Sequence, residues 1–175
     1  MLTVRRLVHR NGLDVLLGAC SQLKEHHDVK CLIGGTGPEL PNLQRIAEEK
    51  DLENVKFLGN ISDDKLPEYY KIADLFTLPT RSGEGFGLVI LEAFASALPV
   101  IATRSGGPEE IIDHGINGLL ISVDSANELA SSIIKLKMDK LMVEQMKKHA
   151  FCKSRKFSWD NNASILEKKL SELIN

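Results

Sequence analysis

The chain has 175 residues, 43% of them hydrophobic and 26% charged, which are the proportions of a soluble globular domain with a substantial core. Its formal net charge of −2 gives no reason to expect nucleic acid or a strongly anionic membrane surface as a partner. No apolar run approaches the ~18–20 residues that a membrane-spanning helix needs and no leader-like segment opens the chain, so a cytosolic (cytoplasmic) location is the default prediction.

Short apolar runs alternate with amphipathic segments along the chain, which is the pattern of a parallel α/β sheet. We expect six strands, near Leu2–Arg5, Val29–Gly34, Val55–Leu58, Asp74–Leu78, Pro99–Ala102 and Gly118–Ile121. Helices are expected between and after them, near Gly12–His26, Leu40–Lys50, Lys65–Ile72, Leu88–Ala97, Glu109–Asp113, Ser125–Lys137, Lys140–Phe151 and Asp160–Leu173. Right-handed crossovers then predict a doubly wound, Rossmann-like parallel sheet in a three-layer α/β/α arrangement, with ligand chemistry at the carboxyl ends of the strands.

No internal repeat, low-complexity tract or linker interrupts this pattern, so we expect a single domain over residues 1–175. The chain begins almost on its first strand, which suggests a domain of a longer protein. Its cysteines, Cys20, Cys31 and Cys152, are odd in number and show no C-x-x-C spacing. This favours buried, inert thiols in a reducing compartment over a metal or redox site.

Residues 79–93 combine a strand end, a glycine-rich turn and a helix start. An apolar, strand-like run at Leu75–Leu78 leads into the turn, and a helix is predicted from Leu88. Unpaired backbone N–H groups at such a helix start, with the positive end of the helix dipole behind them, form a seat for a phosphate. Gly85 and Gly87 lack the Cβ atoms that would keep a ligand away from that backbone.

Two carboxylates flank this seat. Glu84 lies in the turn, and Glu92 lies one turn inside the predicted helix, roughly 6 Å along the axis from Leu88 at ~1.5 Å per residue. A ligand with hydroxyl groups at both ends and a diphosphate in the middle fits this layout. A nucleotide sugar is such a ligand.

The segment from Glu84 to Glu92 resembles the E-x7-E signature of family 4 retaining glycosyltransferases, which have the two-domain GT-B architecture. Two glutamates eight positions apart are common by chance. The frame E-G-F-G-L-V-x-L-E-A, directly after a strand and directly before a helix, makes the match specific. The resemblance covers nearly the whole chain and implies that it is the C-terminal, donor-binding half of such an enzyme.

The resemblance implies a role for each residue of this segment. Glu84 would be a catalytic residue that faces the transferred sugar. Contacts to the hydroxyl groups of that sugar would come from the backbone of the turn, at Gly85, Phe86 and Gly87. The amides of Leu88 and Val89 would hold the diphosphate, and Glu92 would accept hydrogen bonds from the ribose hydroxyls.

The loop after the first strand resembles the family's first C-domain motif, in which an arginine and, five residues on, a lysine bind the donor diphosphate. Arg6 falls on the arginine position, which makes it the second residue with an implied catalytic role. Asn11 occupies the lysine position, where its amide can donate a hydrogen bond but brings no charge. A lost charge-assisted contact to phosphate costs about 1.5–3 kcal/mol, unless Arg10 turns inward. On this interpretation, Asn11→Lys should tighten nucleotide binding.

Two other loops are implicated less specifically. The G-G-x-G sequence at residues 34–37 is a weak phosphate signal, so a structural turn and a direct ligand contact at Gly35 both stay open. In similar enzymes the segment equivalent to residues 59–66 borders the nucleobase. Backbone groups at Ile61 would reach the base edge and Leu66 would line its face. A core strand followed by a helix explains the same residues equally well, and nothing here specifies the base.

Three further positions after the Glu84–Glu92 segment can be compared with the family pattern. Family members usually carry glycine at the position of Ala97, so if the backbone there needs a positive φ, alanine costs about 1 kcal/mol. The turn at Gly106 and Gly107 is expected to approach the same pocket from the next strand end. His114 is expected to be a turn residue and not an acid or base.

The resemblance implies retaining transfer of a sugar from a nucleotide donor, without a cofactor and most often without a catalytic metal. A glycan or lipid-linked acceptor, and any peripheral membrane association, would belong to an N-terminal domain that this chain lacks. We therefore expect the isolated chain to bind donor weakly and not to transfer sugar. Two alternatives stay open: a non-catalytic nucleotide-binding or regulatory subunit of a split enzyme, and another GT-B activity such as a nucleotide-sugar epimerase.

Overall fold

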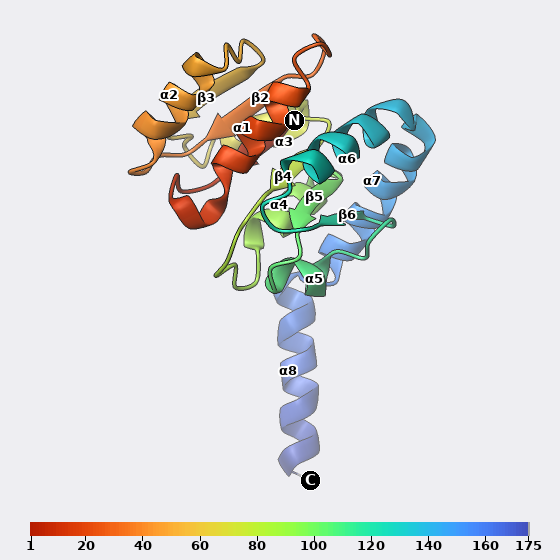
Figure 1. The fold of residues 1–175 in the computed structure, drawn as a ribbon. Helices are drawn as coiled ribbons and strands as arrows, with labels where there is room; N and C mark the ends of the chain where they lie inside the picture. Colours follow the sequence, from red (N-terminus) through yellow and green to blue (C-terminus); the bar gives the residue numbers. More distant parts are fainter. Residues whose placement is uncertain (175) are drawn as a thin grey trace.

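A computed structural model describes residues 1–174, leaving aside the side chains of Trp159, Asn162, Leu173 and Ile174. Its centre is one sheet of six parallel strands in the order β3-β2-β1-β4-β5-β6 (Figure 1). The strands are β1 (Leu2–Val4), β2 (Cys31–Gly34), β3 (Val55–Gly59), β4 (Phe76–Leu78), β5 (Val100–Thr103) and β6 (Gly118–Ile121). This is the doubly wound, Rossmann-like order, so the predicted fold class is confirmed.

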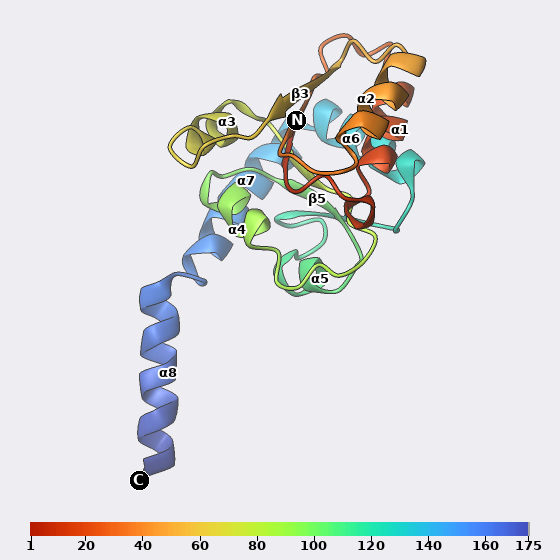
Figure 2. The same cartoon turned by 90° about the vertical axis from the view of Figure 1, so that its left-hand side faces the viewer.

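Helices cover both faces of the sheet, as Figure 2 shows edge-on. One face carries α1 (Leu13–Gln22), α2 (Leu40–Glu49) and α6 (Ala126–Met138). The other carries α3 (Leu66–Ile72), α4 (Leu88–Ala95), α5 (Gly107–Ile111) and α7 (Lys140–Arg155). A short 3-10 helix, η1 (His9–Asn11), precedes α1, and α8 (Trp159–Ile174) ends the described chain.

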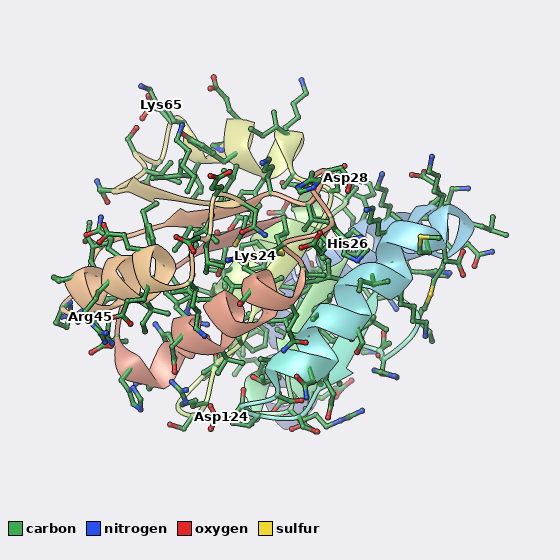
Figure 3. All side chains as sticks on the ribbon, turned by 45° about the horizontal axis from the view of Figure 1, so that its top comes forward. Lys24, His26, Asp28, Arg45, Lys65 and Asp124 are labelled. Atoms are coloured by element: carbon green, nitrogen blue, oxygen red, sulfur yellow. The ribbon has the colours of Figure 1, made fainter. Side chains whose placement is uncertain are left out.

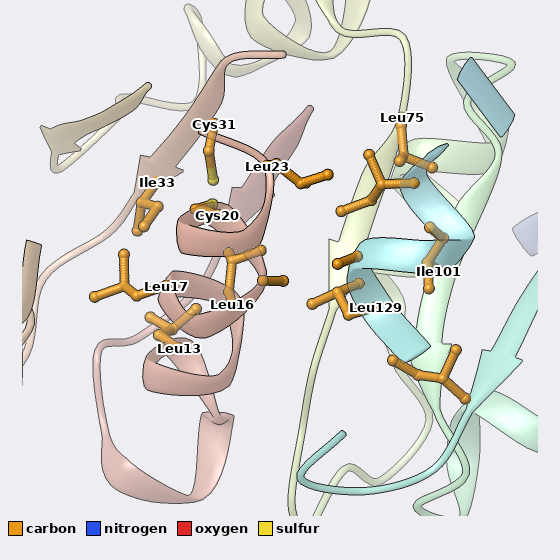
Figure 4. Packing of buried hydrophobic residues seen from close by; sticks show 14 of the residues in the cluster. Leu13, Leu16, Leu17, Cys20, Leu23, Cys31, Ile33, Leu75, Ile101 and Leu129 are labelled. Carbon is orange, nitrogen blue, oxygen red and sulfur yellow. The ribbon is translucent and has the colours of Figure 1, made fainter. Parts of the chain in front are cut away.

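Strand residues alternate between two hydrophobic cores because successive side chains of a strand point to opposite faces. In β5, Ile101 packs in the core under α1 and α6, whereas Val100 and Ala102 pack in the core under α4. Figure 4 shows the first core, in which Leu16 and Leu17 of α1 fill the space against the sheet. Both cores are needed because a parallel sheet is buried on both faces.

The predicted end of the first helix is wrong by four residues. The helix ends at Gln22 and not at His26. The Leu23 amide donates to both Ala19 and Cys20 carbonyls, and its buried side chain anchors a turn in which the His26 amide donates to the Leu23 carbonyl. The chain needs this turn to reverse toward β2, which begins at Cys31.

The positive φ considered for Ala97 is observed, and His114 lies in the turn before β6. Ala97 has φ 55° just past the end of α4, so alanine stands where the backbone favours glycine. The His114 ring accepts a hydrogen bond at Nδ1 from the Leu120 amide at 2.9 Å, which ties the turn to β6.

The last helix, α8, projects away from the sheet and its covering helices (Figures 1 and 2). Its apolar side chains Ile165, Leu166 and Leu170 are about half exposed. Charged side chains, including Lys24, Arg45 and Lys65, project from well-separated parts of the surface (Figure 3). Within residues 1–174, no helix combines the length and the apolar character that crossing a bilayer requires.

Candidate active site

The site lies where the strand order reverses, between β1 and β4. These strands pair at one position, Leu2 with Phe76, whereas β1 and β2 pair at three. Beyond that position the loops after β1 and β4 meet directly: the Arg81 amide donates to the Arg10 carbonyl at 2.8 Å. A reversal of this kind leaves a crevice at the carboxyl ends of the strands, which is where open α/β sheets bind ligands.

Arg5 joins the two sides of this crevice. Its Nη1 donates to Thr80 Oγ1 at 2.6 Å, and its Nη2 donates to Glu84 Oε2 at 2.9 Å. The same Nη2 donates to Asn11 Oδ1 at 2.7 Å, and the Asn11 amide nitrogen donates to the Arg6 carbonyl at 2.6 Å. One guanidinium therefore orients a residue of each loop.

This ion pair is largely shielded from solvent, with 9% of the Arg5 side chain and 17% of the Glu84 side chain exposed. Burial lowers the pKa of the Arg5 guanidinium, and the nearby Glu84 carboxylate offsets part of that effect. An arginine pKa is high enough that the group stays charged at neutral pH. The crevice therefore holds a fixed positive charge beside a fixed carboxylate.

The glycine-rich turn presents a helix start to this crevice. Gly87 caps α4 with φ 77°, a left-handed conformation that favours glycine. The Ile90 amide donates back to the Gly87 carbonyl at 2.8 Å, whereas the amides of Leu88 and Val89 have no acceptor among the described residues. These two N–H groups lie at the positive end of the helix dipole and are available to an anion.

The next strand end supports this turn from behind. Glu84 forms an isolated parallel bridge with Gly106, and a Cβ on Gly107 would lie 1.8 Å from the Gly85 carbonyl oxygen. A side chain at position 107 would therefore displace the turn. The expectation that Gly106 and Gly107 approach the same pocket is confirmed.

Glu92 is exposed on α4 and is held from the side. Its Oε2 accepts a hydrogen bond from the Tyr70 hydroxyl at 2.8 Å. Burial, and then the Glu92 carboxylate, raises the pKa of the Tyr70 hydroxyl, so Tyr70 stays protonated as a donor. Tyr70 thereby fixes one carboxylate oxygen of Glu92. The other oxygen has no partner among the described residues and is available to a ligand.

A second arginine clamps the rim of the site. Both Nη atoms of Arg81 donate to the Asp14 carboxylate at 2.7 Å, and its Nε donates to Asp124 at 2.5 Å. Its Nη1 also donates to the His9 carbonyl at 2.9 Å. The loop after β4 is thus fastened to α1 and to the loop before α6.

The other predicted site residues lie around the same edge of the sheet. Arg6 is exposed, with its carbonyl held by Asn11. Gly35 has φ 119°, and a Cβ there would lie 1.9 Å from the Arg5 carbonyl oxygen, so this glycine is required by the close approach of two loops. Ile61 packs over Gly34, and Leu66 is half-buried against the core under α4. Phe86 is 43% exposed and contacts Phe157 edge-on at 5.6 Å between ring centroids.

Three residues of the site were missed by the sequence analysis: Arg5, Thr80 and Tyr70. A signal existed for Arg5, because a charged residue at the carboxyl end of a predicted strand lies where ligands bind. None existed for Tyr70, which meets Glu92 only through the packing of α3 against α4. The ligand roles predicted for the site residues stay predictions.

Within the described part of the chain, no three His, Cys, Asp or Glu side chains gather as metal ligands. A groove of about 650 Å³ opens at the opposite, amino edge of the sheet, where Val29, Leu75 and Lys137 are among its lining. The charged pair, the glycine turn and the free amides described above all lie at the carboxyl edge. The chemistry therefore belongs to the open crevice and not to the groove.

Comparison with known proteins agrees with this geometry. A family model described as glycosyl transferases group 1 matches residues 1–152. The GDP-mannose-dependent alpha-(1-6)-phosphatidylinositol monomannoside mannosyltransferase of Mycobacterium tuberculosis is 34% identical over 148 residues, which are 80% of this chain and 38% of that protein. The chain therefore spans less than half the length of this curated relative.

Solved structures match over almost the whole chain. Alr3699/HepE of Anabaena, in complex with UDP and glucose, superposes with a TM-score of 0.88 at 28% identity over 97% of this chain and 47% of that one. The C-terminal domain of a glycosyl transferase group 1 family protein (LpcC) from Francisella tularensis superposes with a TM-score of 0.82 at 26% identity, over 90% of this chain and 86% of that one. The fold is thus that of a C-terminal domain of such proteins.

Proposed function

Because the chain belongs to the glycosyl transferases group 1 family, we propose that it is the nucleotide-sugar-binding domain of a retaining glycosyltransferase with the GT-B architecture. The observation that carries the proposal is the α4 helix start, where the amides of Leu88 and Val89 have no acceptor among the described residues, with Glu84 in the turn before it and Glu92 one turn further on. A nucleotide sugar has its sugar, diphosphate and ribose in the same order.

In this proposal the bond between the anomeric carbon and the β-phosphate oxygen breaks, a bond from that carbon to an acceptor hydroxyl oxygen forms, and the departing diphosphate takes up the hydroxyl proton. The departing nucleoside diphosphate gains negative charge in the transition state. The amides of Leu88 and Val89 and the basic residues of the β1 loop stabilise that charge, which is electrostatic catalysis at the leaving group. We propose that these groups suffice without a cofactor or a catalytic metal.

Glu84 and Glu92 then have different roles. Glu84, held by Arg5 and Thr80, is placed to bind hydroxyl groups of the transferred sugar. Glu92, held on one oxygen by Tyr70, is placed to accept from the ribose hydroxyls. The acceptor, any peripheral membrane association and the cytosolic location stay predictions, and the acceptor site is assigned to a further domain.

The test is calorimetric titration of the 175-residue chain with UDP, GDP and ADP, because the relatives' names include both GDP-mannose and UDP. We expect one of them to bind with one-to-one stoichiometry. Glu92→Gln should weaken it by about tenfold or more, since hydrogen bonds to a charged group contribute about 1.5–3 kcal/mol. Glu48→Gln, at an exposed glutamate on α2, is the matched control and should bind as the wild type does. A folded chain that binds none of the three contradicts the proposal.

A non-catalytic subunit of a split enzyme is the second candidate. It is favoured by Asn11, which brings no positive charge to the position where the family carries a lysine. Both candidates predict nucleotide binding and differ in chemistry. The test is sugar transfer by this chain together with a chain that supplies the other domain. Transfer that Glu84→Gln abolishes supports the enzyme. Nucleotide binding by this chain, with transfer by the pair unchanged in Glu84→Gln, supports the non-catalytic subunit.

A further inference from the structure

Asn11 stands where the family carries a positively charged lysine, and in the structure a guanidinium lies directly against it. Arg5 Nη2 lies 2.7 Å from Asn11 Oδ1 and 2.9 Å from Glu84 Oε2. The Arg5 side chain is 91% buried in the crevice, at the level of the glycine turn. The charge is present at position 5 and not at position 11.

We propose that Arg5 supplies the positive charge that binds the donor diphosphate, and that Asn11 is the neutral acceptor that holds its guanidinium in place. The proposal rests on the proposed function, and it assigns to Arg5 a role that the sequence analysis gave to other residues.

The hydrogen bonds made by the N–H groups of Arg5 support this assignment. A guanidinium has five N–H donors, and three are engaged, by Thr80, Asn11 and Glu84. Its Nε is buried and has no partner among the described residues. A buried N–H without a partner is costly, so the contacts among the described residues leave the hydrogen-bonding capacity of Arg5 incompletely satisfied.

Charge balance supports it as well. Without Arg5, the largely buried Glu84 carboxylate would face the diphosphate as a like charge, and repulsion is stronger for a buried group than in bulk water. Arg5 neutralises Glu84, and one N–H of its Nη1 has no partner among the described residues. In this proposal Arg5 therefore orients the Glu84 carboxylate, which binds the sugar, and also binds the departing diphosphate.

Asn11 is suited to this arrangement because it is uncharged. A lysine at position 11 would replace the acceptor of Arg5 with an ammonium group in almost the same place, and two cations that close repel each other. Asn11→Lys should therefore weaken diphosphate binding, which is the opposite of the expectation from the sequence.

The experiment is a double-mutant cycle read by calorimetry with UDP, GDP and the nucleosides uridine and guanosine. We expect Arg5→Ser to lower the affinity for the nucleoside diphosphate by about tenfold or more, and to change the affinity for the nucleoside by less than about twofold. Asn11→Lys should also weaken it. The double variant should bind the diphosphate more tightly than either single variant. Serine at position 5 leaves space for the new lysine at position 11 and removes the arginine charge that would repel it. Arg45→Ser, which removes an exposed arginine of α2, is the matched control and should change neither ligand.

Each other result has a definite meaning. Equal losses for diphosphate and nucleoside in Arg5→Ser, or tighter binding in Asn11→Lys, overturn the assignment. If Arg5→Ser does not fold, Arg5→Lys and Arg5→Gln replace it: a larger loss of diphosphate binding with the neutral glutamine is expected, and equal losses overturn the assignment. A wild-type chain that binds no nucleotide overturns the proposed function and the assignment together, whereas wild-type binding that is insensitive to Arg5 overturns the assignment alone.

Discussion

Two buried threonines on neighbouring strands differ in whether their hydroxyl groups are satisfied. Thr77 of β4 is fully buried and its Oγ1 has no partner among the described residues. Thr103 of β5 is equally buried, and its Oγ1 donates to the Thr80 carbonyl at 2.5 Å. The cost of a buried hydroxyl depends on that difference.

Thr77→Val should therefore stabilise the protein by about 1 kcal/mol, because it removes an unsatisfied hydroxyl and keeps the shape of the side chain. In thermal unfolding this corresponds to a rise in Tm of about 2–4 °C. Thr103→Val is the matched control and should lower the Tm, because it leaves the Thr80 carbonyl without its donor. A fall in Tm for both variants would show that the Thr77 hydroxyl has a partner.

Ala97 allows a second test on a single residue. With φ 55° it pays for a left-handed conformation that glycine adopts freely, so Ala97→Gly should stabilise the protein by about 1 kcal/mol. Ala95→Gly, two residues earlier and exposed inside α4, should destabilise it by about 1 kcal/mol. Opposite shifts in the urea midpoint with unchanged m-values would confirm the backbone argument, and shifts of the same sign would contradict it.

At this scale the sequence predicted residue types better than residue contacts. The frame from Glu84 to Glu92 identified the turn, the helix start and both carboxylates, because those follow from local spacing. It did not identify Arg5, whose partners lie as far as position 84, or Tyr70, which lies 22 positions from Glu92. Long-range pairs of side chains depend on strand order, which no local pattern contains.

At the scale of elements, Arg81 couples three segments and makes their packing sensitive to acid. The pKa of Asp14 lies below its usual value: burial raises it, and the hydrogen bonds and charge of Arg81 lower it by more. A carboxyl whose pKa is lower in the folded than in the unfolded state stabilises the fold above its unfolded pKa, about 3.9, and loses that contribution as pH falls through its folded pKa.

Arg81→Met should therefore lower stability at pH 7 by about 1 kcal/mol, and its difference from wild type should shrink below about pH 4. The measurement is the Tm of both proteins from pH 7 to pH 3. Arg45→Met is the matched control, because the Arg45–Glu49 pair is 58% exposed on each side and should contribute little at any pH. A difference for Arg81→Met that does not change with pH would contradict the role of Asp14.

Element positions followed from the alternation of apolar and amphipathic runs, and all six strands were predicted within two residues of their observed ends. The largest errors are at two helix ends: α1 ends early at Gln22, where the chain turns to bury Leu23, and α7 continues to Arg155, four residues past its predicted end at Phe151. The sequence predicted a doubly wound sheet but not its strand order, because no local pattern shows that β1 lies between β2 and β4.

At the scale of the whole molecule, α8 contributes little to the fold. Every described side chain from Asp160 to Glu172 is exposed. A chain ending at Asp160 should keep its Tm within about 2 °C, because the described side chains that it lacks are exposed, and should lose helical circular dichroism in proportion to the part of α8 that is removed. A chain ending at Asp139, which also lacks the buried Met146 and Ala150 of α7, should not fold. A large fall in Tm for the first truncation would show that α8 packs on the domain.

The single position at which β1 pairs with β4 has a consequence for local opening. Within the sheet, two well-paired halves, β3-β2-β1 and β4-β5-β6, pair at the single position of Leu2 and Phe76, and the remaining contacts between them come from loops, side chains and the packing of α1 against α6. Regions of a protein open with different free energies, and cooperative units follow such boundaries. Native-state hydrogen exchange should therefore resolve two subglobal units that separate along the line where we propose that the donor binds, and a bound nucleotide should slow exchange in both.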